Sequence, residues 1–213
     1  MASHLAFVVG NGESLKNTNL NRVKGISFGV NNIHLHYANT DWRPTHYVRA
    51  EEASGLEPEN WMESMRVHLD MGCEIWCNDY FFRPRFGLKQ TEKVHFLKTC
   101  THYQKHFNNP DAPHLLHLPV LCTFGSSVNV AVQIAITHGF SPVYLLGCDL
   151  DANMRHFSAE YRHGKEQENR FAQMDALAAH MIAARSGHLI YNATQGGSLE
   201  VYERVDFETL DFG

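Results

Sequence analysis

The chain has 213 residues, of which 44% are hydrophobic and 19% are charged, with a formal net charge of -5. Its length fits one large α/β domain spanning residues 1–213 better than two ordinary domains. It has no cluster of lysine and arginine and no apolar run of about 20 residues, which argues against nucleic-acid binding and against a transmembrane segment. Together with the missing export signal, these features predict a cytoplasmic protein. They leave open whether it works at a membrane surface or as a homo-oligomer.

Cysteine and histidine spacing does not predict a metal centre. The five cysteines are an odd number and lie mostly in strand-like or helix-like runs, as reduced core thiols do. Cys73 and Cys77 lack the second pair of a zinc site. Neighbouring histidines such as His34 and His36 lack the acidic partner of a metalloprotease helix. The expectation is therefore a protein without a metal cofactor.

The first predicted strand, residues 5–9, leads straight into the loop GNGES at residues 10–14. Glycines let a ligand approach the backbone, and free N–H groups at a helix start attract an anion. The pattern indicates a phosphate cradle, or else an ordinary turn between a strand and a helix. Leu15 stands where a dinucleotide fingerprint has its third glycine, and no P-loop lysine follows, so neither NAD binding nor a Walker ATPase is supported. The residues of the candidate cradle are Gly10, Asn11, Gly12 and Ser14.

Strands and helices alternate along the rest of the N-terminal half. Strands are predicted at residues 26–30, 46–48, 73–77 and 114–118, and helices at residues 58–69 and 91–107. Residues 81–89 show no clear periodicity and are predicted to form an irregular loop. Asn31 follows a predicted strand, where its amide can bond a base or a ribose or can serve as a turn residue. The alternation predicts an α/β fold with a doubly wound, mostly parallel sheet.

A complete helix–turn–strand unit lies in the middle of the chain. The apolar run 128–138 follows hydroxyls that can cap a helix, Gly139 suits the left-handed position after a helix, and residues 143–146 form a continuous apolar strand. Asp149 follows this strand, where open α/β sheets bind ligands, and is the first functional candidate. Asp149 and Asp151 could hold one metal ion together. We expect instead that Asp149 bonds the ligand or the local backbone and that Asp151 is solvated.

The segment 152–168 is polar and longer than an ordinary connection, which predicts a lid over the site. It contains His156 and His163, and a histidine with an ordinary pKa of about 6.5 can serve as a general base. After this segment come a helix at residues 166–185, a strand at residues 188–191 and the loop NATQGG at residues 192–197.

Three motifs together carry a resemblance to a known family: GNGESLK after the first strand, GSSVNVAVQIAITHGFSPVYLLGCDLD in the middle, and NATQGG near the end. The combination resembles the bacterial lipooligosaccharide sialyltransferases and the related motility-accessory-factor flagellin glycosyltransferases. The resemblance implies a nucleotide-binding domain with a Rossmann-like fold of the GT-A-variant type. The archaeal hydroxymethylpterin diphosphokinases share this general framework.

The resemblance also implies roles for individual residues. The first loop would cradle the nucleotide phosphate, and Asn31, Asn78 and Ser127 would contact the nucleotide. The acid at the end of the central strand is Asp149. The nearby histidine of the accessory-factor branch falls on His156, which makes it the expected base, with His163 as the reserve.

The implied function is that of an inverting, sialyltransferase-like glycosyltransferase. It would use a CMP-activated acidic sugar as donor and a glycan or glycoconjugate as acceptor, and a histidine base would take the acceptor proton without a metal. One alternative is a diphosphokinase-like enzyme in which Asp149 and Asp151 hold Mg²⁺ on ATP. The other is a nucleotide-binding protein without catalysis. Metal dependence distinguishes the first two readings.

Overall fold

The computed structural model describes residues 4–50, 58–100, 120–122, 126–151, 156–158, 176–177, 179–181, 183–184 and 186–212. Within these residues the strands form one sheet in the order β6-β5-β4-β3-β2-β1-β7-β8-β9, and every strand pair is parallel. The strands are β1 Ala6–Val9, β2 Ile26–Val30, β3 His46–Arg49, β4 Glu74–Asn78, β5 Val94–Cys100, β6 Val120–Cys122, β7 Val143–Leu146, β8 Ile190–Asn192 and β9 Glu203–Arg204. The predicted α/β class with a mostly parallel sheet is confirmed.

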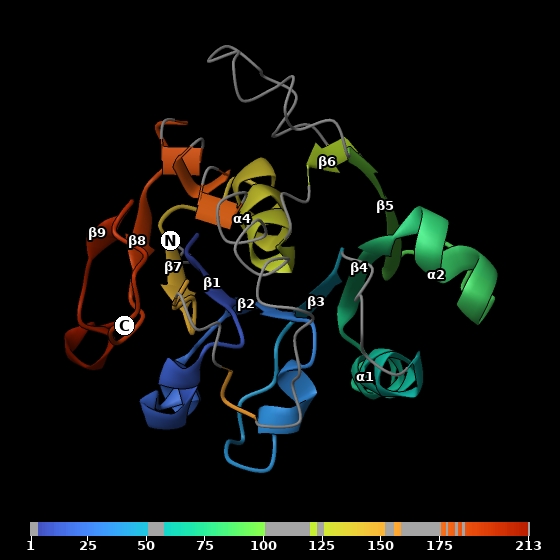
Figure 1. Cartoon of the computed structure of the whole chain (residues 1–213), viewed down its shortest axis with the longest axis horizontal. Helices are drawn as coiled ribbons and strands as arrows, with labels where there is room; N and C mark the ends of the chain where they lie inside the picture. The colour runs from blue at the N-terminus through green and yellow to red at the C-terminus, as the bar shows by residue number, and fades with distance from the viewer. Residues whose placement is uncertain are drawn as a thin grey trace.

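Helices cover both faces of the sheet (Figure 1). The α-helices are α1 Pro58–Asp70, α2 Asp79–Phe86 and α4 Ser127–Thr137, and the 3-10 helices are η1 Glu13–Asn17, η2 Leu20–Arg22, η3 Ile33–His36 and η5 Phe207–Thr209. α4 packs on one face against β1, β2, β3 and β7, whereas α1 and α2 lie on the other face beside β4 and β5. Each face has its own cluster of buried apolar side chains, so the sheet is doubly wound.

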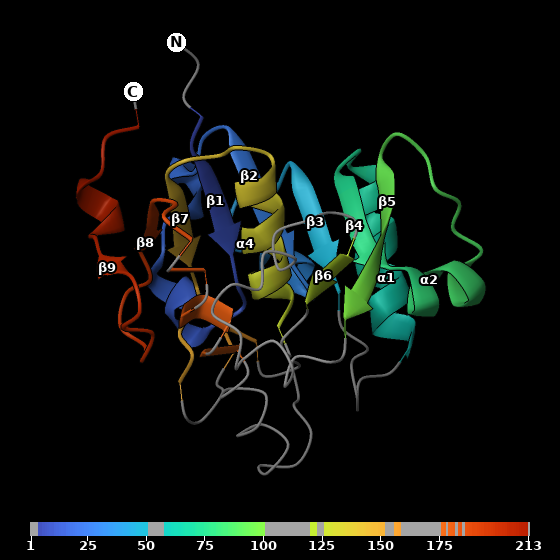
Figure 2. The ribbon, with the colours of Figure 1, turned by 90° about the horizontal axis from the view of Figure 1, so that it is seen from above.

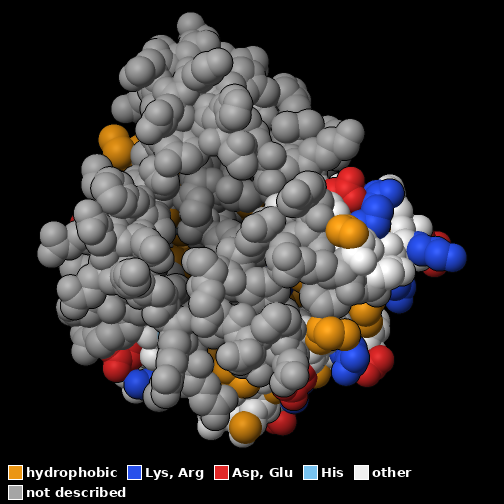
Figure 3. Space-filling view, turned by 45° about the vertical axis from the view of Figure 1, so that its right-hand side comes forward, with side chains coloured by type: hydrophobic (Ala, Val, Ile, Leu, Met, Phe, Trp, Pro, Cys, Tyr) orange, Lys and Arg blue, Asp and Glu red, His pale blue; other side chains and the backbone are white. Residues whose placement is uncertain are grey.

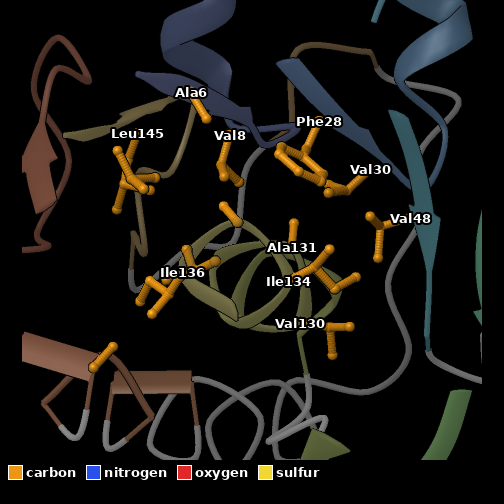
Figure 4. Packing of buried hydrophobic residues seen from close by; sticks show 14 of the residues in the cluster. Ala6, Val8, Phe28, Val30, Val48, Val130, Ala131, Ile134, Ile136 and Leu145 are labelled. Atoms are coloured by element: carbon orange, nitrogen blue, oxygen red, sulfur yellow. The ribbon is translucent and has the colours of Figure 1, made fainter. Parts of the chain in front are cut away.

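α4 forms the centre of one apolar layer. Ser126 caps the helix by accepting a hydrogen bond from the Val128 N–H, and Gly139 follows the helix with a φ of 79°. Almost every residue between these ends is buried. Figure 4 shows Ala131 of α4 facing Val8 and Phe28 of the strands. A helix with apolar side chains on most of its circumference is stable only inside a core, which explains its central position.

The order of the strands defines one special place in the sheet. β2 to β6 follow β1 in chain order on one side, whereas β7, β8 and β9 lie on its other side. The chain therefore changes direction between β1 and β7, and ligands of open α/β sheets bind at the carboxyl ends of strands beside such a switch point. In Figure 2 the arrowheads of β1, β3 and β5 point the same way, toward this carboxyl edge.

The prediction of a helix over residues 91–107 is wrong in its described part, because residues Val94–Cys100 form β5. Val94, Phe96 and Leu97 are all buried, and the strand pairs with both β4 and β6. Its sequence VHFLKTC has neither the apolar–polar alternation of a half-buried strand nor the continuous apolar run of a strand covered on both faces, so the sequence did not identify it.

Residues 81–89 were expected to form a loop, but most of them belong to α2. An ion pair of 2.6 Å joins Arg83 to Asp79 one helical turn earlier, and Phe82 is fully buried. Pro84 lies inside this short helix and obscured it in the sequence, since proline is rare in helix interiors.

Other expectations fall partly outside the described residues. This holds for the strand at residues 114–118, for His163, and for all of the 152–168 segment except residues 156–158. In the predicted helix at residues 166–185, the described residues from 176 to 184 are helical.

The described part of the surface has mixed charge. On the face in Figure 3, cationic, anionic and apolar side chains lie next to one another on the coloured part of the molecule. Among the described residues there is no helix with the length and apolar character needed to cross a bilayer.

Ile134→Ala should lower the free energy of unfolding by about 2–5 kcal/mol, because Ile134 is fully buried in the α4 layer and its truncation leaves a cavity. The matched control is Leu189→Ala, whose side chain is 55% exposed and should change stability by less than about 0.5 kcal/mol. Urea denaturation of both variants measures the difference. Equal effects would contradict the assigned core.

Candidate functional site

The first loop runs against the end of β7 at the switch point. The Gly10 N–H donates to the Leu146 carbonyl and the Gly12 N–H donates to the Gly147 carbonyl, both at 2.8 Å. A Cβ at Gly10 would collide with the Gly147 carbonyl group. Glycine at this position therefore serves the close approach of two backbone segments within the protein.

The carboxylate of Asp149 is bound by the same loop. Asp149 is 7% exposed, and its side chain accepts hydrogen bonds from the Ser14 N–H at 2.9 Å and from the Ser14 hydroxyl. The first of these bonds satisfies a backbone N–H at the start of η1, where the N-cap residue Gly12 has no side chain to cap the helix. A Cβ at Gly12 would lie 2.5 Å from Asp149 Cγ. Hydrogen bonds to a charged group contribute roughly 1.5–3 kcal/mol each, so this contact fixes the loop.

The sequence left open whether this loop is a phosphate cradle or an ordinary turn between a strand and a helix. The N–H groups of Gly10, Gly12 and Ser14 all donate within the protein. The Asp149 carboxylate already stands at the start of η1, where the sequence suggested an external anion. An anionic ligand at this edge has to be bound mainly by other groups.

His156 lies directly against the first loop. Its Nδ1 is 2.9 Å from the Asn11 carbonyl oxygen, and the Phe157 N–H donates to the same oxygen at 3.1 Å. The backbones of Gly12 and His156 also form an isolated antiparallel β-bridge. A carbonyl oxygen only accepts, so Nδ1 carries the proton and, in the neutral ring, Nε2 carries the lone pair. His163 lies outside the described residues.

Asn11 connects the first loop to the neighbouring strand. Its side-chain Nδ2 donates to the carbonyl of Val30, the last residue of β2, at 2.9 Å. Asn11 is 6% exposed. This side chain therefore links the ends of β1 and β2 along the carboxyl edge.

Asn31 follows β2 in the left-handed region, with a φ of 51°. Its carbonyl accepts hydrogen bonds from the Tyr47 hydroxyl at 2.7 Å and from the Ser64 hydroxyl at 2.8 Å. Its own side chain is half-buried and makes no hydrogen bond to any residue that the structure describes. A side-chain-bearing residue pays roughly 1–2 kcal/mol for this backbone conformation, so the two buried hydroxyls hold it there.

A buried histidine supports these hydroxyls. His68 stacks on Tyr47 with ring centroids 3.8 Å apart, donates from Nδ1 to the Ser64 carbonyl at 2.6 Å, and accepts at Nε2 from the Tyr37 hydroxyl at 2.7 Å. Burial is the main cause that lowers the pKa of His68 to about 3. The imidazole is therefore neutral near pH 7.

The next two strand ends are joined through Ala50. Its N–H donates to the Ser127 hydroxyl at 3.1 Å, and its carbonyl accepts from Asn78 Nδ2 at 3.2 Å. Ser127 and Asn78 are both buried. The helix cap itself is Ser126, so Ser127 instead fastens the start of α4 to the end of β3.

The sequence did not single out Arg49 as a site residue. This last residue of β3 is 2% exposed, and its guanidinium donates to the Asn32 side chain at 2.9 Å. Its charge contributes, after burial, to the lowered pKa values of His34 and His68. Its position directly at a strand's carboxyl end was the available signal. Its guanidinium also lies 3.4 Å from the Tyr47 hydroxyl that bonds the Asn31 carbonyl, so Arg49 places a buried positive charge near Asn31.

Within the described ranges, no three His, Cys, Asp or Glu side chains are grouped so that they could hold a metal ion. Of the two acids considered as ligands, Asp149 is engaged by Ser14 and Asp151 is half-buried.

Comparisons with family models and with curated proteins find no match. Among solved structures, the MAf glycosyltransferase from Magnetospirillum magneticum AMB-1 is similar with a TM-score of 0.62 at 16% identity, over 99% of this chain and 35% of that chain. The sialyltransferase CstII from Campylobacter jejuni, in complex with the substrate analogue CMP-3FNeuAc, gives 0.52 at 18% identity, over 94% and 84% of the two chains. The chain has the fold of these enzymes.

A second sialyltransferase structure, CST-II with a trisaccharide acceptor and CMP, gives a TM-score of 0.54 at 15% identity, over 94% of this chain and 85% of that chain. The chain spans about a third of the length of the MAf enzyme. The resemblance suggested by the three motifs is thus matched at the level of the fold.

His68→Gln should make stability less dependent on pH. The folded protein keeps His68 neutral down to a pKa of about 3, whereas the unfolded chain takes up a proton near the ordinary value of 6.5. The unfolded state therefore binds more protons between these values, and the free energy of unfolding falls as the pH decreases through this window.

Urea denaturation at about pH 7 and about pH 5 measures this effect. The loss of stability between the two should be smaller in His68→Gln than in the wild type. His188→Gln, which changes an exposed histidine, should behave as the wild type. An equal loss in His68→Gln and in the wild type would refute the neutral buried imidazole.

Proposed function

We propose that this chain carries the donor-binding and catalytic part of an inverting, sialyltransferase-like glycosyltransferase with a CMP-activated acidic sugar as donor and a glycan as acceptor. The fold shared with MAf and CstII supports this proposal, and CstII itself was solved with CMP-3FNeuAc. Because the chain spans 35% of the MAf enzyme, the proposal concerns the reaction and not every part of such a protein.

The observation that carries the proposal is the contact between His156 and Asn11. The hydrogen bond from Nδ1 to the Asn11 carbonyl orients the imidazole against the first loop and sets the tautomer with its lone pair on Nε2. Nε2, the ring nitrogen that can accept a proton, is thus held beside the switch point between β1 and β7, where the fold favours a ligand.

In the proposed reaction, the acceptor hydroxyl oxygen forms a bond to the anomeric carbon as the bond from that carbon to the phosphate oxygen breaks. The hydroxyl proton passes to Nε2 of His156, and CMP leaves with the electron pair of the broken bond. The buried charge of Arg49 and the start of α4 offset the negative charge on the leaving phosphate. Asp149 holds the first loop and does not itself transfer a proton.

The diphosphokinase-like alternative requires Asp149 to hold Mg²⁺. Each of its carboxylate oxygens already accepts one hydrogen bond from Ser14, so fewer of its lone pairs remain for a metal ion. This arrangement favours the glycosyltransferase. A nucleotide-binding protein without catalysis would have the same contacts, so only an activity measurement distinguishes it from the glycosyltransferase.

Titration calorimetry with CMP, UDP, GDP and ATP should show the tightest binding for CMP, with the same affinity in chelator and in magnesium. The proposed donor needs hydrogen-bonding groups and Arg49, and none of these requires a metal. ATP binding that appears only with magnesium would instead support the diphosphokinase-like function.

His156→Ala should lower turnover by roughly 100-fold to 10,000-fold and leave CMP affinity nearly unchanged, because proton removal acts in the transition state. His163→Ala is the matched control and should change turnover little. Steady-state kinetics with CMP-sugar donors and calorimetry measure the two effects. Wild-type turnover in His156→Ala would exclude His156 as the base, and a large loss in His163→Ala alone would assign the role to that residue.

A further inference from the structure

The loop of residues 192–199, which begins at the last residue of β8, is held by one arginine of the edge strand β9. The Arg204 guanidinium donates to the carbonyls of Thr194 at 3.1 Å, Gly196 at 2.7 Å and Gly197 at 3.1 Å. Gly196 and Gly197 have φ values of 78° and 73°, so both lie in the left-handed region that glycine adopts easily. Several parallel N–H donors in a fixed plane let one arginine define the shape of a whole loop.

A carboxylate keeps the guanidinium in place. Glu200 Oε1 lies 3.0 Å from Arg204 Nη2 and 3.2 Å from Arg204 Nε. The Arg204 side chain is 31% exposed, so this ion pair contributes orientation more than stability. The carbonyl contacts are what connect Arg204 to the loop.

The same loop packs on the backbone of the candidate site. The Ser198 N–H donates to the Asp149 carbonyl at 2.6 Å, and the Cys148 N–H donates to the Thr194 hydroxyl at 3.0 Å. A Cβ on Gly197 would lie 2.6 Å from Asp149 Cα. The backbone that carries the Asp149 carboxylate toward Ser14 is therefore fixed from behind by this loop.

We propose that Arg204 is a positioning residue that acts through the loop 192–199 on Asp149, and through Asp149 on the first loop at Ser14. The effect on nucleotide binding rests on the proposed function, whereas the effect on the Ser14–Asp149 contact does not. Each step is a direct contact: Arg204 to the loop carbonyls, Ser198 to the Asp149 carbonyl, and the Asp149 carboxylate to Ser14.

Two adjacent glycines provide a matched test of the middle step. Gly197→Ala and Gly196→Ala introduce the same methyl group at nearly the same left-handed φ, so the backbone strain is similar. At Gly197 the methyl group meets the Asp149 backbone, whereas at Gly196 no atom lies within 4 Å. A difference in Ser14 protection between the two variants therefore reports the displacement of the Asp149 backbone.

The main readout is amide hydrogen exchange of the Ser14 N–H in the protein without ligand. Gly197→Ala should lower its protection by roughly 10-fold to 100-fold, and Gly196→Ala should leave it within about 3-fold of the wild type. The Ile75 N–H, which donates to the Lys93 carbonyl at the far end of the sheet, should keep its protection in both variants. Equal protection of Ser14 in the two variants would overturn the proposal.

Arg204→Met tests the first step, with Arg22→Met as its control. Arg22 likewise donates to backbone carbonyls, at 2.8 Å to Leu210 and 3.4 Å to Phe207, but it does not contact the loop 192–199. Arg204→Met should lower Ser14 protection and Arg22→Met should not. If Arg204→Met does not fold, Arg204→Lys provides the same comparison, since an ammonium group cannot reproduce the planar set of donors. Unchanged Ser14 protection in the folded Arg204 variant would refute the positioning role.

CMP titration of the same variants separates the two proposals. Lower Ser14 protection with roughly 10-fold weaker CMP binding in Gly197→Ala, and neither change in Gly196→Ala, supports both. Lower Ser14 protection with no CMP binding even in the wild type supports the positioning role and contradicts the donor assignment. In an Asp149→Ala background, Arg204→Met should weaken CMP binding no further, because the two residues act in series. Additive losses would contradict this.

Discussion

The carboxylate of Asp149 bound to Ser14 is the contact on which the carboxyl edge of the sheet depends. A buried carboxylate is stable only where hydrogen-bond donors surround it, and here the donors are the Ser14 N–H and hydroxyl. The loop can reach it only because Gly12 has no side chain. The position of the Asn11 carbonyl, and hence that of His156, follows from this closure.

A second constraint acts at the end of β2. There the buried hydroxyls of Tyr47 and Ser64 hold the Asn31 carbonyl, and neutral His68 supports both. Polar networks of this kind are stable only if their members are satisfied, which requires His68 to remain unprotonated. The edge of the sheet thus combines a strained backbone at Asn31 with a buried hydrogen-bond network that holds it. The burial of apolar side chains around α4 stabilises the opposite face of the sheet.

The elements predicted best have local signals. The run before Gly139 and the strand ending at Leu146 are apolar and bounded by turn residues, so α4 and β7 were predicted within a residue or two. β5 was missed because its sequence VHFLKTC shows neither a regular apolar–polar alternation nor a continuous apolar run, and α2 because Pro84 hides its helical pattern. The sequence also placed Asp149 at a strand end. It could not show that Asp149 bonds Ser14, 135 residues earlier, because that contact depends on β7 pairing with β1.

The charges along this edge indicate where a phosphate ligand would bind. Asp149 repels an anion beside the first loop, and the nearest N–H groups of that loop already donate within the protein. Arg49 is a buried positive charge at the end of β3, and the next residue, Ala50, bonds Ser127 at the start of α4. We therefore expect the donor phosphate to lie nearer β3 than β1. On the proposed function, His156, which bonds the Asn11 carbonyl of the first loop, then lies on the β1 side of that phosphate.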